Sequence, residues 1–267
     1  MAHSHPIVKI PPQLCRPILA YGSSGMIGRD VENDQEVWKC PIRYDTHQCS
    51  PEGVAQAHEV ESYSALCMDR ERSIYQHHPL HENILQGLQI SDIGIRLPYM
   101  QHGNIRAFCQ TRCVTDQTKD QWIKAAIAAI AHLHSHGVIH ADLSPRNFLV
   151  TDHLALKLCD FGGSGLQDLP SIAEEEDPYR IFPGTPRSFH TDVFALGCLI
   201  YEIAVGKKPY ADIDDEDWEQ IANNYAAGSF PRLDRVKYQH IIRHCWILQY
   251  DDAQDVLRDI GAMESPP

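Results

Sequence analysis

Apolar residues alternate with polar ones early in the chain. The two stretches ILAYGSSGMIGRDV and EVWKCPI, between residues 17 and 43, are rich in β-branched and aromatic residues and contain a Gly-rich turn. This pattern is typical of three short strands joined by turns. After residue 81, NILQGLQI and GIRLPYM are two further apolar runs. We expect them to add two more strands.

Helical spacing appears between these two groups of strands and again in the second half. From Pro51, which suits a first helical turn, apolar residues recur at Val54, Ala57, Val60, Ala65 and Met68. An Ala-rich apolar pattern covers 117–135 and predicts a buried helix. Three more helical patterns follow in DWEQIANNYAAGSF, RLDRVKYQHIIRHCW and DDAQDVLRDIGAM.

Composition narrows the possible partners. The chain has 267 residues, enough for one domain or one two-lobed unit, and a net charge of −13. Such acidity argues against nucleic-acid and anionic-membrane binding, which need basic surfaces. It is compatible with basic protein substrates, although a solvated acidic surface with no partner is the preferred explanation.

Targeting signals and cysteines suggest an intracellular protein. No apolar run approaches the ~20 residues of a membrane-spanning helix, and the first residues lack the pattern of a signal peptide. Nine cysteines without regular spacing favour reduced thiols. We therefore expect a cytoplasmic or nuclear protein. The His residues of IAHLHSHGVIH are expected to have structural roles, and two thiols at Cys109 and Cys113 do not make a zinc site.

Candidate chemistry is concentrated in HADLSPRNFLV and LKLCDFGG, residues 140–163. Asp142 and Asn147 lie on one short loop, and Asp160 follows an apolar hairpin. Phosphoryl transfer requires a base for the hydroxyl proton and oxygen ligands that hold Mg²⁺ against a triphosphate. Asp142 suits the base, and Asn147 and Asp160 suit the metal ligands.

These segments resemble the protein-kinase motifs H-R-D-x-x-x-x-N and D-F-G. The resemblance implies an α+β, two-lobed protein kinase-like fold that uses ATP and Mg²⁺ and acts on a protein substrate. It implies an N-lobe over 15–100, a hinge at about 98–103 and a C-lobe over 104–262, which together form one kinase domain over 15–262. Residues 1–14 are expected to be a loose arm and 263–267 a tail.

The same resemblance assigns the nucleotide-binding residues. Lys39 corresponds to the strand Lys that holds the α- and β-phosphates, and Glu71 to its helix partner, with Glu59 and Glu61 as rivals. The Gly-rich loop corresponds to Ala20, Gly22, Gly25 and Ile27, with Ala20 in place of the usual first Gly. Further residues are expected around adenine, with Leu97 as gatekeeper and Met100 in the hinge: Val37, Leu97, Met100 and Leu149.

The catalytic loop departs from the common pattern at two positions. Ala141 replaces the usual Arg, and Ser144 replaces the Lys of serine/threonine kinases. Arg146, four residues after Asp142, lies where tyrosine kinases have an Arg, and we expect it to take over the contact with the γ-phosphate. D-L-S-P-R-N also resembles the loop of small fungal kinase-like proteins.

The segment 163–188 corresponds to the activation segment but has no A-P-E motif. Asp192, in DVFALG, is expected to be buried and to support the catalytic-loop backbone. Without an Arg at position 141, an added phosphate would lack its usual cation, and the acidic run 174–177 would repel it. We therefore predict activity that does not depend on phosphorylation at Ser164, Ser171, Tyr179 or Thr185, near which only Arg180 and Arg187 are evident cations.

Three functions remain open from the sequence. The preferred hypothesis is an active protein kinase acting on Ser/Thr or Tyr hydroxyls, because Lys39, Asp142, Asn147 and Asp160 are all present. Ala20, Ala141 and the missing A-P-E favour a pseudokinase that binds ATP as a scaffold. A small-molecule phosphotransferase of the aminoglycoside type shares the Asp and Asn loop, but D-F-G and the Asp192 motif argue against it.

Overall fold

The computed structural model describes residues 5–77 and 79–264, and the chain divides into two compact units. The first unit extends up to Leu80 and also includes Leu85–Tyr99 and Asp160–Gly162. The second comprises His81–Ile84, Met100–Cys159 and the chain from Gly163 onward. The main passage from the first unit to the second thus falls between Tyr99 and Met100, within the expected hinge.

The first unit is built on a five-stranded antiparallel sheet with the order β2-β3-β4-β7-β6. The strands are short, and all five lie in the predicted apolar runs: β2 (Ala20–Gly22), β3 (Gly25–Arg29), β4 (Glu36–Cys40), β6 (Gln89–Ile90) and β7 (Ile95–Pro98). The register sets Ile27 opposite both Ala20 and Lys39, and Val37 opposite Leu97. The predicted strands are therefore confirmed.

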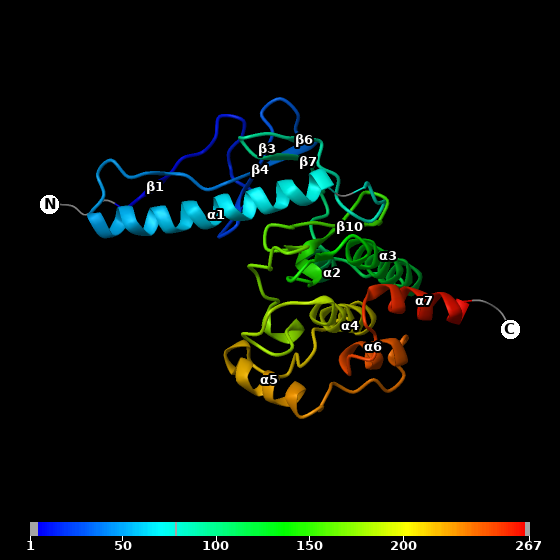
Figure 1. The fold of residues 1–267 in the computed structure, drawn as a ribbon. Helices are drawn as coiled ribbons and strands as arrows, with labels where there is room; N and C mark the ends of the chain where they lie inside the picture. The colour runs from blue at the N-terminus through cyan, green and yellow to red at the C-terminus, as the bar shows by residue number, and fades with distance from the viewer. Residues whose placement is uncertain (1–4, 78, 265–267) are drawn as a thin grey trace. The chain divides into compact units, whose positions relative to one another are not determined.

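One long helix, α1 (Pro51–His77), runs along this sheet (Figure 1). Its buried residues recur at helical spacing: Ala57, Ser64, Cys67, Met68, Arg70, Glu71 and Ile74. No proline or glycine interrupts it after Gly53, so the backbone hydrogen bonds can continue for 27 residues. Ser64 connects the helix to the strands, because its hydroxyl accepts the backbone N–H of Ile42 at 2.9 Å.

The segment before the sheet is more ordered than the sequence suggests. Strand β1 (Ile7–Val8) pairs with β5 (Tyr44–Asp45), and Leu14 is only 5% exposed. Leu14 packs in the core of the first unit with Met26, Trp38, Cys40 and Ile42. The expected loose arm over 1–14 is therefore corrected for residues 7–14, because apolar side chains there fill the core. Residues 1–4 lie outside the described residues.

The second unit is mainly helical. Helix α3 (Asp116–Ser135) packs against α4 (Phe189–Val205) and α7 (Ala253–Glu264), and α4 packs against α6 (Gln239–Trp246) (Figure 1). Helices α2 (Ile105–Thr111) and α5 (Trp218–Ala226) complete the set of α-helices in the part of the chain described. The predicted helices are confirmed, and α7 extends through 263 and 264, which were expected to belong to a tail.

Buried aromatic and aliphatic side chains hold these helices together. Trp122 of α3 is 1% exposed, and its indole N–H donates to the carbonyl oxygen of Leu154 at 2.7 Å. A fully buried large apolar side chain contributes about 1.5–3 kcal/mol relative to an exposed one. Gly197 of α4 allows a close helix contact, because a Cβ there would lie 2.5 Å from Cβ of Cys245. The packed helices therefore hold the ends of the loops that connect them in place.

Short strands and turns of the second unit carry the predicted catalytic loop. Strands β9 (Phe148–Val150) and β10 (Leu156–Leu158) form an antiparallel hairpin, and β8 (Val138–Ile139) pairs with β11 (Gly165–Leu166). The 3₁₀ turn η1 (Pro145–Asn147) lies between β8 and β9. Two other 3₁₀ turns are η2 (Asp177–Tyr179) and η3 (Asp215–Asp217).

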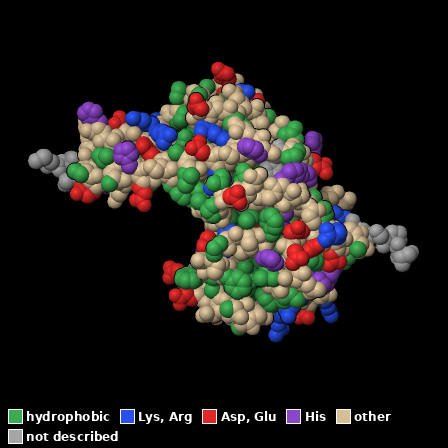
Figure 2. All heavy atoms as spheres, in the orientation of Figure 1, with side chains coloured by type: hydrophobic (Ala, Val, Ile, Leu, Met, Phe, Trp, Pro, Cys, Tyr) green, Lys and Arg blue, Asp and Glu red, His purple; other side chains and the backbone are tan. Residues whose placement is uncertain are grey.

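The surface is mixed in charge. On the face drawn in Figure 2, Asp and Glu side chains lie in several separate groups, with Lys and Arg between them. Among the described residues, none of the helices is long and apolar enough to cross a membrane. All nine cysteines are free thiols, and the described part of the chain has no group of three or more His, Cys, Asp or Glu that could hold a metal ion.

Candidate active site

Lys39 forms the centre of a buried charge cluster in the first unit. Its Nζ lies 2.5 Å from Oε2 of Glu71 and 2.7 Å from Oδ1 of Asp160. Burial alone would lower the pKa of Lys39, but the carboxylates of Asp160 and Glu71 outweigh it and raise that pKa. Lys39 therefore stays cationic although the residue is only 4% exposed.

The structure distinguishes Glu71 from its rivals on the same helix. Glu71 is 1% exposed, and in addition to Lys39 it accepts the backbone N–H of Phe161. Glu61 instead accepts the backbone N–H of Tyr44 at 2.6 Å, and Glu59 is exposed. The helix rotation thus brings Glu71 alone of these three to Lys39.

The D-F-G segment is fixed by packing within the first unit. Phe161 is fully buried, and its ring meets Tyr75 edge to face with centroids 5.4 Å apart. Asp160 has a left-handed φ of 67°, a strained conformation for a residue other than Gly. Such strain is found at functional sites when the surrounding contacts impose it. Here Lys39 binds the Asp160 side chain, and Tyr75 packs against the next residue, Phe161.

The Gly-rich turn shows two different reasons for its glycines. At Gly25 a Cβ would lie 2.8 Å from the carbonyl oxygen of Cys40, so strand packing itself excludes a side chain. At Gly22 a Cβ would meet nothing within 4 Å. The close approach of the neighbouring strand therefore explains why position 25 is a glycine. At position 22, in contrast, the structure leaves room for a side chain. Ala20 and Ile27 face each other in the β2–β3 pair.

The other residues expected around adenine lie on two inner strands of the sheet, shortly after β7 and on the β9–β10 hairpin. Val37 and Leu97 are buried neighbours on β4 and β7. Met100 is the first residue of its stretch of the second unit, and its carbonyl oxygen accepts the N–H of Gly103 at 3.0 Å. Leu149 is half-buried on β9, where it lies opposite Lys157.

Asp142 and Asn147 are joined directly in the second unit. The side-chain amide of Asn147 donates to the backbone carbonyl of Asp142 at 2.6 Å and to its Oδ2 at 3.0 Å. Ser144 caps the 3₁₀ turn that carries Asn147, with its hydroxyl accepting the N–H of Arg146 at 3.4 Å. The loop thus orients the amide and the carboxylate toward each other.

The predicted support by Asp192 is confirmed. Its carboxylate is fully buried and accepts the backbone N–H of His140 at 2.6 Å and of Ala141 at 2.9 Å. These bonds hold Ala141 at a left-handed φ of 68°. His134, one of the clustered histidines, lies 3.2 Å from Asp192 and accepts the N–H of Ala253 at 3.1 Å. Its position is that of a structural residue.

Arg146 lies in a charge cluster that the sequence did not indicate. Its guanidinium lies 3.7 Å from Oδ1 of Asp142 and 3.4 Å from Oε1 of Glu176. Glu176 also accepts two parallel hydrogen bonds from Arg106 of α2, at 2.9 and 3.0 Å. Burial opposes ionisation of Glu176, but Arg106 and Arg146 prevail and lower its pKa. The carboxylate of Glu176 is thus held beside the catalytic loop.

The rest of the acidic run is also paired. Glu175 and Arg187 form an ion pair at 2.8 Å with side chains that are 0% and 1% exposed. Glu174 lies 3.0 Å from Arg180, which also contacts Asp177. The argument that 174–177 would repel an added phosphate is therefore corrected, because these carboxylates are matched by arginines of this and other segments.

Comparison with known proteins now identifies the family. The family described as "Protein kinase domain" matches residues 54–259. This chain belongs to the protein kinase domain family. The α+β fold and the D-F-G and Asp192 motifs agree with that membership. The family implies ATP as the phosphoryl donor.

Several curated kinases resemble this kinase domain over part of its length. Serine/threonine-protein kinase RUNKEL of Arabidopsis thaliana is 35% identical over 124 residues, 43% of this chain and 9% of that protein. Serine/threonine-protein kinase YPK3 of Saccharomyces cerevisiae is 32% identical over 138 residues, 45% of this chain and 26% of that protein. An Aurora kinase of Debaryomyces hansenii is 27% identical over 175 residues, 61% of this chain and 40% of that protein. The chain thus spans less than half the length of each of these relatives.

The kinase domain contains an anchored activation segment that sequence reasoning missed. The pair Arg106 and Glu176 is separated by 70 residues, so no local spacing reveals it. Of the four hydroxyls named above, Ser164 and Tyr179 are fully buried, and the hydroxyl of Thr185 donates to the carbonyl oxygen of Phe182 at 2.7 Å. In this segment the carboxylate of Glu176 is bound by both Arg106 and Arg146.

We therefore predict that phosphatase treatment of the kinase leaves its transfer rate within about twofold, because the segment is held by the carboxylate of Glu176 and needs no phosphate for that contact. The measurement is the initial rate on a peptide substrate before and after dephosphorylation.

Glu176→Gln should lower turnover by roughly tenfold, since a charge-assisted contact with Arg106 is worth about 1.5–3 kcal/mol. The same initial rate measures this effect.

Glu174→Gln is the matched control, because Glu174 is a neighbouring surface carboxylate that contacts Arg180 rather than the catalytic loop. It should retain the wild-type rate. A large loss after dephosphorylation, mapped to Ser171 or Thr185, would contradict the role given to Glu176.

Proposed function

We propose that this chain is an active protein kinase that transfers the γ-phosphoryl group of ATP to a Ser or Thr hydroxyl of a protein substrate. The observation that carries this proposal is Lys39, held at 2.5 Å from Glu71 and 2.7 Å from Asp160 in the described structure. A buried cation between two carboxylates is oriented and permanently charged, as a phosphate ligand must be.

Nucleotide binding is assigned to Lys39 and the residues of the small sheet. Lys39 would contact the α- and β-phosphates, with Glu71 fixing its direction. The residues proposed to surround adenine and ribose, and to cover the phosphates, are Ala20, Gly22, Gly25, Ile27, Val37, Leu97, Met100 and Leu149. Their apolar side chains and open glycine suit a flat base and a triphosphate.

Asn147 and Asp160 are proposed as the protein ligands of Mg²⁺. The two bonds of Asn147 to Asp142 use its amide nitrogen, which leaves the amide oxygen for a metal. The Asp160 carboxylate is 37% exposed and provides the hard oxygen that Mg²⁺ prefers. These donors therefore fit the ion. When bound, Mg²⁺ would neutralise charge on the phosphates.

Asp142 is proposed as the base for the substrate hydroxyl. Its carboxylate is partly exposed, at 27%, and the amide of Asn147 and the guanidinium of Arg146 orient it. Arg146 is 49% exposed and is proposed to contact the γ-phosphate in place of the Lys that Ser144 replaces. Its contacts with Asp142 and Glu176 place it beside the base, which supports this role.

The choice of Ser/Thr over Tyr rests on the relatives. Two of those described above are named serine/threonine-protein kinases. The position of Arg146 in the loop favours Tyr, but its partner Glu176 gives it a second explanation. The net charge of −13 is compatible with a basic substrate.

A transfer assay tests the proposal. Purified protein, ATP and Mg²⁺ are combined with matched peptides that differ only in Ser, Thr or Tyr, and we expect labelling of Ser and Thr. Asp160→Asn should weaken binding of Mg²⁺-ATP by about tenfold or more, since it removes one charge from the ligand set. Asp92→Asn, an exposed substitution in the same unit, should not.

The outcomes separate the competing functions. ATP binding with no transfer to any peptide would indicate the pseudokinase alternative. Transfer to an aminoglycoside but not to peptides would indicate a small-molecule phosphotransferase. Labelling of the Tyr peptide alone would overturn the hydroxyl assignment but leave the kinase assignment intact.

A further inference from the structure

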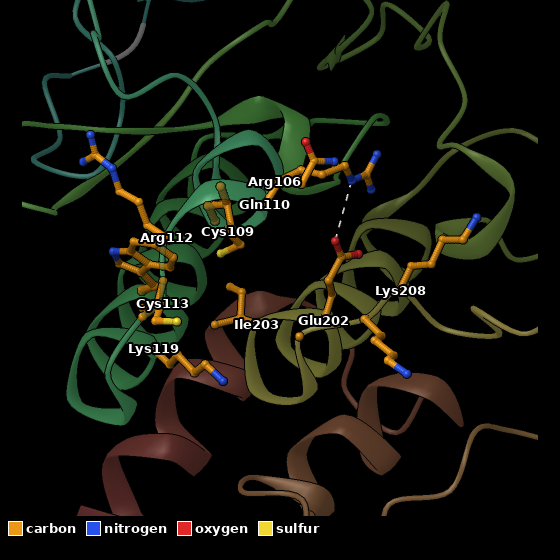
Figure 3. A pocket seen from close by; sticks show the side chains of 14 residues that line it. Arg106, Cys109, Gln110, Arg112, Cys113, Lys119, Glu202, Ile203 and Lys208 are labelled. Atoms are coloured by element: carbon orange, nitrogen blue, oxygen red, sulfur yellow. Dashed lines mark ion pairs between the residues drawn. The ribbon is translucent and has the colours of Figure 1, made fainter.

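The second unit contains a cavity of about 640 Å³ that none of the roles above uses. It lies where α2, the beginning of α3 and the end of α4 meet (Figure 3). Apolar residues from these elements form part of its lining: Ile105, Val114, Trp122 and Ile203. The volume is within the range of ligand-binding pockets.

The cavity is strongly cationic in a chain that is acidic overall. Five of its lining residues are basic: Arg106, Arg112, Lys119, Lys207 and Lys208. Among the described residues of the lining, Glu202 is the one carboxylate, and Arg106 lies 3.6 Å from it (Figure 3). Because Glu202 and Glu176 both bind Arg106, the positive charge of the cavity comes from Arg112, Lys119, Lys207 and Lys208, in a chain whose net charge is −13.

Two of these cations have contacts with groups other than carboxylates. The ammonium group of Lys119 donates to the carbonyl oxygen of Ala204 at 3.2 Å. Arg112 lies 4.9 Å from the ring centroid of Phe108 and 3.2 Å from Nδ1 of His102. Such contacts orient the side chains without cancelling their charges. Lys207 is exposed, directly after Gly206, which ends α4 in a left-handed conformation.

The arrangement of the cations indicates the kind of ligand. In Figure 3 the side chains of Arg112 and Lys208 extend away from each other on opposite sides of the cavity, and they do not converge on one point. A single phosphate group would be bound by converging donors. A polyanion such as RNA would be repelled by the acidic remainder of the surface. A short chain with separated carboxylates fits both observations.

We infer that this cavity binds an acidic peptide segment of a partner protein, with an apolar side chain of the segment on the floor and its carboxylates against the rim cations. The lining contains none of the residues proposed for phosphoryl transfer, and only Arg106 of the lining residues named above also binds Glu176. The apolar floor provides affinity, and the cations provide selectivity for acidic sequences and faster association.

The test is fluorescence anisotropy with a short labelled peptide of alternating Glu and Leu. Binding is measured without ATP on the full chain carrying Asp142→Asn, so that its outcome is independent of catalysis. We expect saturable binding that weakens by about tenfold or more in Arg112→Glu/Lys207→Glu, two exposed positions on the rim. Raising the salt from about 0.05 M to about 0.5 M should also weaken it, because exposed charge contacts are screened.

The controls make the proposal falsifiable. Lys9→Glu/Arg43→Glu changes the net charge equally at exposed positions of the first unit and should bind like the parent. A peptide with Lys in place of Glu, and one with Ser in place of Leu, should bind at least tenfold more weakly. Equal binding by both charge-reversed proteins, or equally tight binding of a single-stranded RNA that the rim substitutions weaken in the same way, would overturn the inference.

Discussion

Asp142→Asn is expected to lower the turnover of phosphoryl transfer by roughly 10²–10⁴-fold while ATP binding persists. The reason is that the substituted amide cannot accept the hydroxyl proton, whereas the loop that carries it keeps its shape. That loop is held by Asp192 through the backbone N–H groups of His140 and Ala141, and neither bond involves the Asp142 side chain. The measurement pairs initial rates with nucleotide titration.

Asp234→Asn, at an exposed site in the same unit, controls for the change of charge and should behave like wild type. The informative comparison is between the rate of phosphoryl transfer and the affinity for ATP. A variant that loses ATP binding together with activity would indicate a collapsed loop instead of a missing base. Equal activity of wild type and Asp142→Asn would reject the role of Asp142 altogether.

Lys39→Met should be costly for both folding and function. It leaves the buried Glu71 carboxylate without its cation, next to Asp160, and breaking one partner of a buried ion pair costs about 3–5 kcal/mol of the free energy of unfolding. Nucleotide binding should also be lost, because Lys39 is the proposed phosphate ligand. Denaturant unfolding and ATP titration measure the two effects separately.

A second substitution separates stability from function at this site. Lys39→Met/Glu71→Leu removes both buried charges and should recover most of the unfolding free energy, since a well-packed apolar pair often replaces a buried ion pair without loss. It should not recover nucleotide binding. If the double variant binds ATP like wild type, Lys39 is a structural residue, and the proposed phosphate contact is wrong.

The buried cluster around Lys39 shows that residue spacing alone does not identify which glutamate of the helix pairs with Lys39. The resemblance to protein kinases favours Glu71 over Glu59 and Glu61, whereas spacing alone does not separate them. All three lie on one continuous helix, α1, and periodicity shows only which residues share a face. Packing against the sheet decided which face meets Lys39.

In the activation segment, the sequence leads to a wrong physical argument about charge. The run of four acidic residues over 174–177 suggested repulsion, because partners far along the chain were not visible. In the fold, Arg106 lies on α2, 70 residues from Glu176, and it binds that carboxylate with two parallel hydrogen bonds. The expectation of phosphate-independent activity remains, but its reason changes from repulsion to a built-in anchor.

The sequence by itself determined what depends on neighbouring residues. The strands from 20 to 40 and the helix from Pro51 follow from local spacing, and the Asp142 and Asn147 loop and the buried Asp192 follow from the resemblance to protein-kinase motifs. Tertiary structure decided what depends on distant ones: the partner of Lys39, the cluster of Arg106, Arg146 and Glu176, and the cationic cavity. Residue spacing fixes directions within one element, whereas contacts between elements depend on how their faces pack.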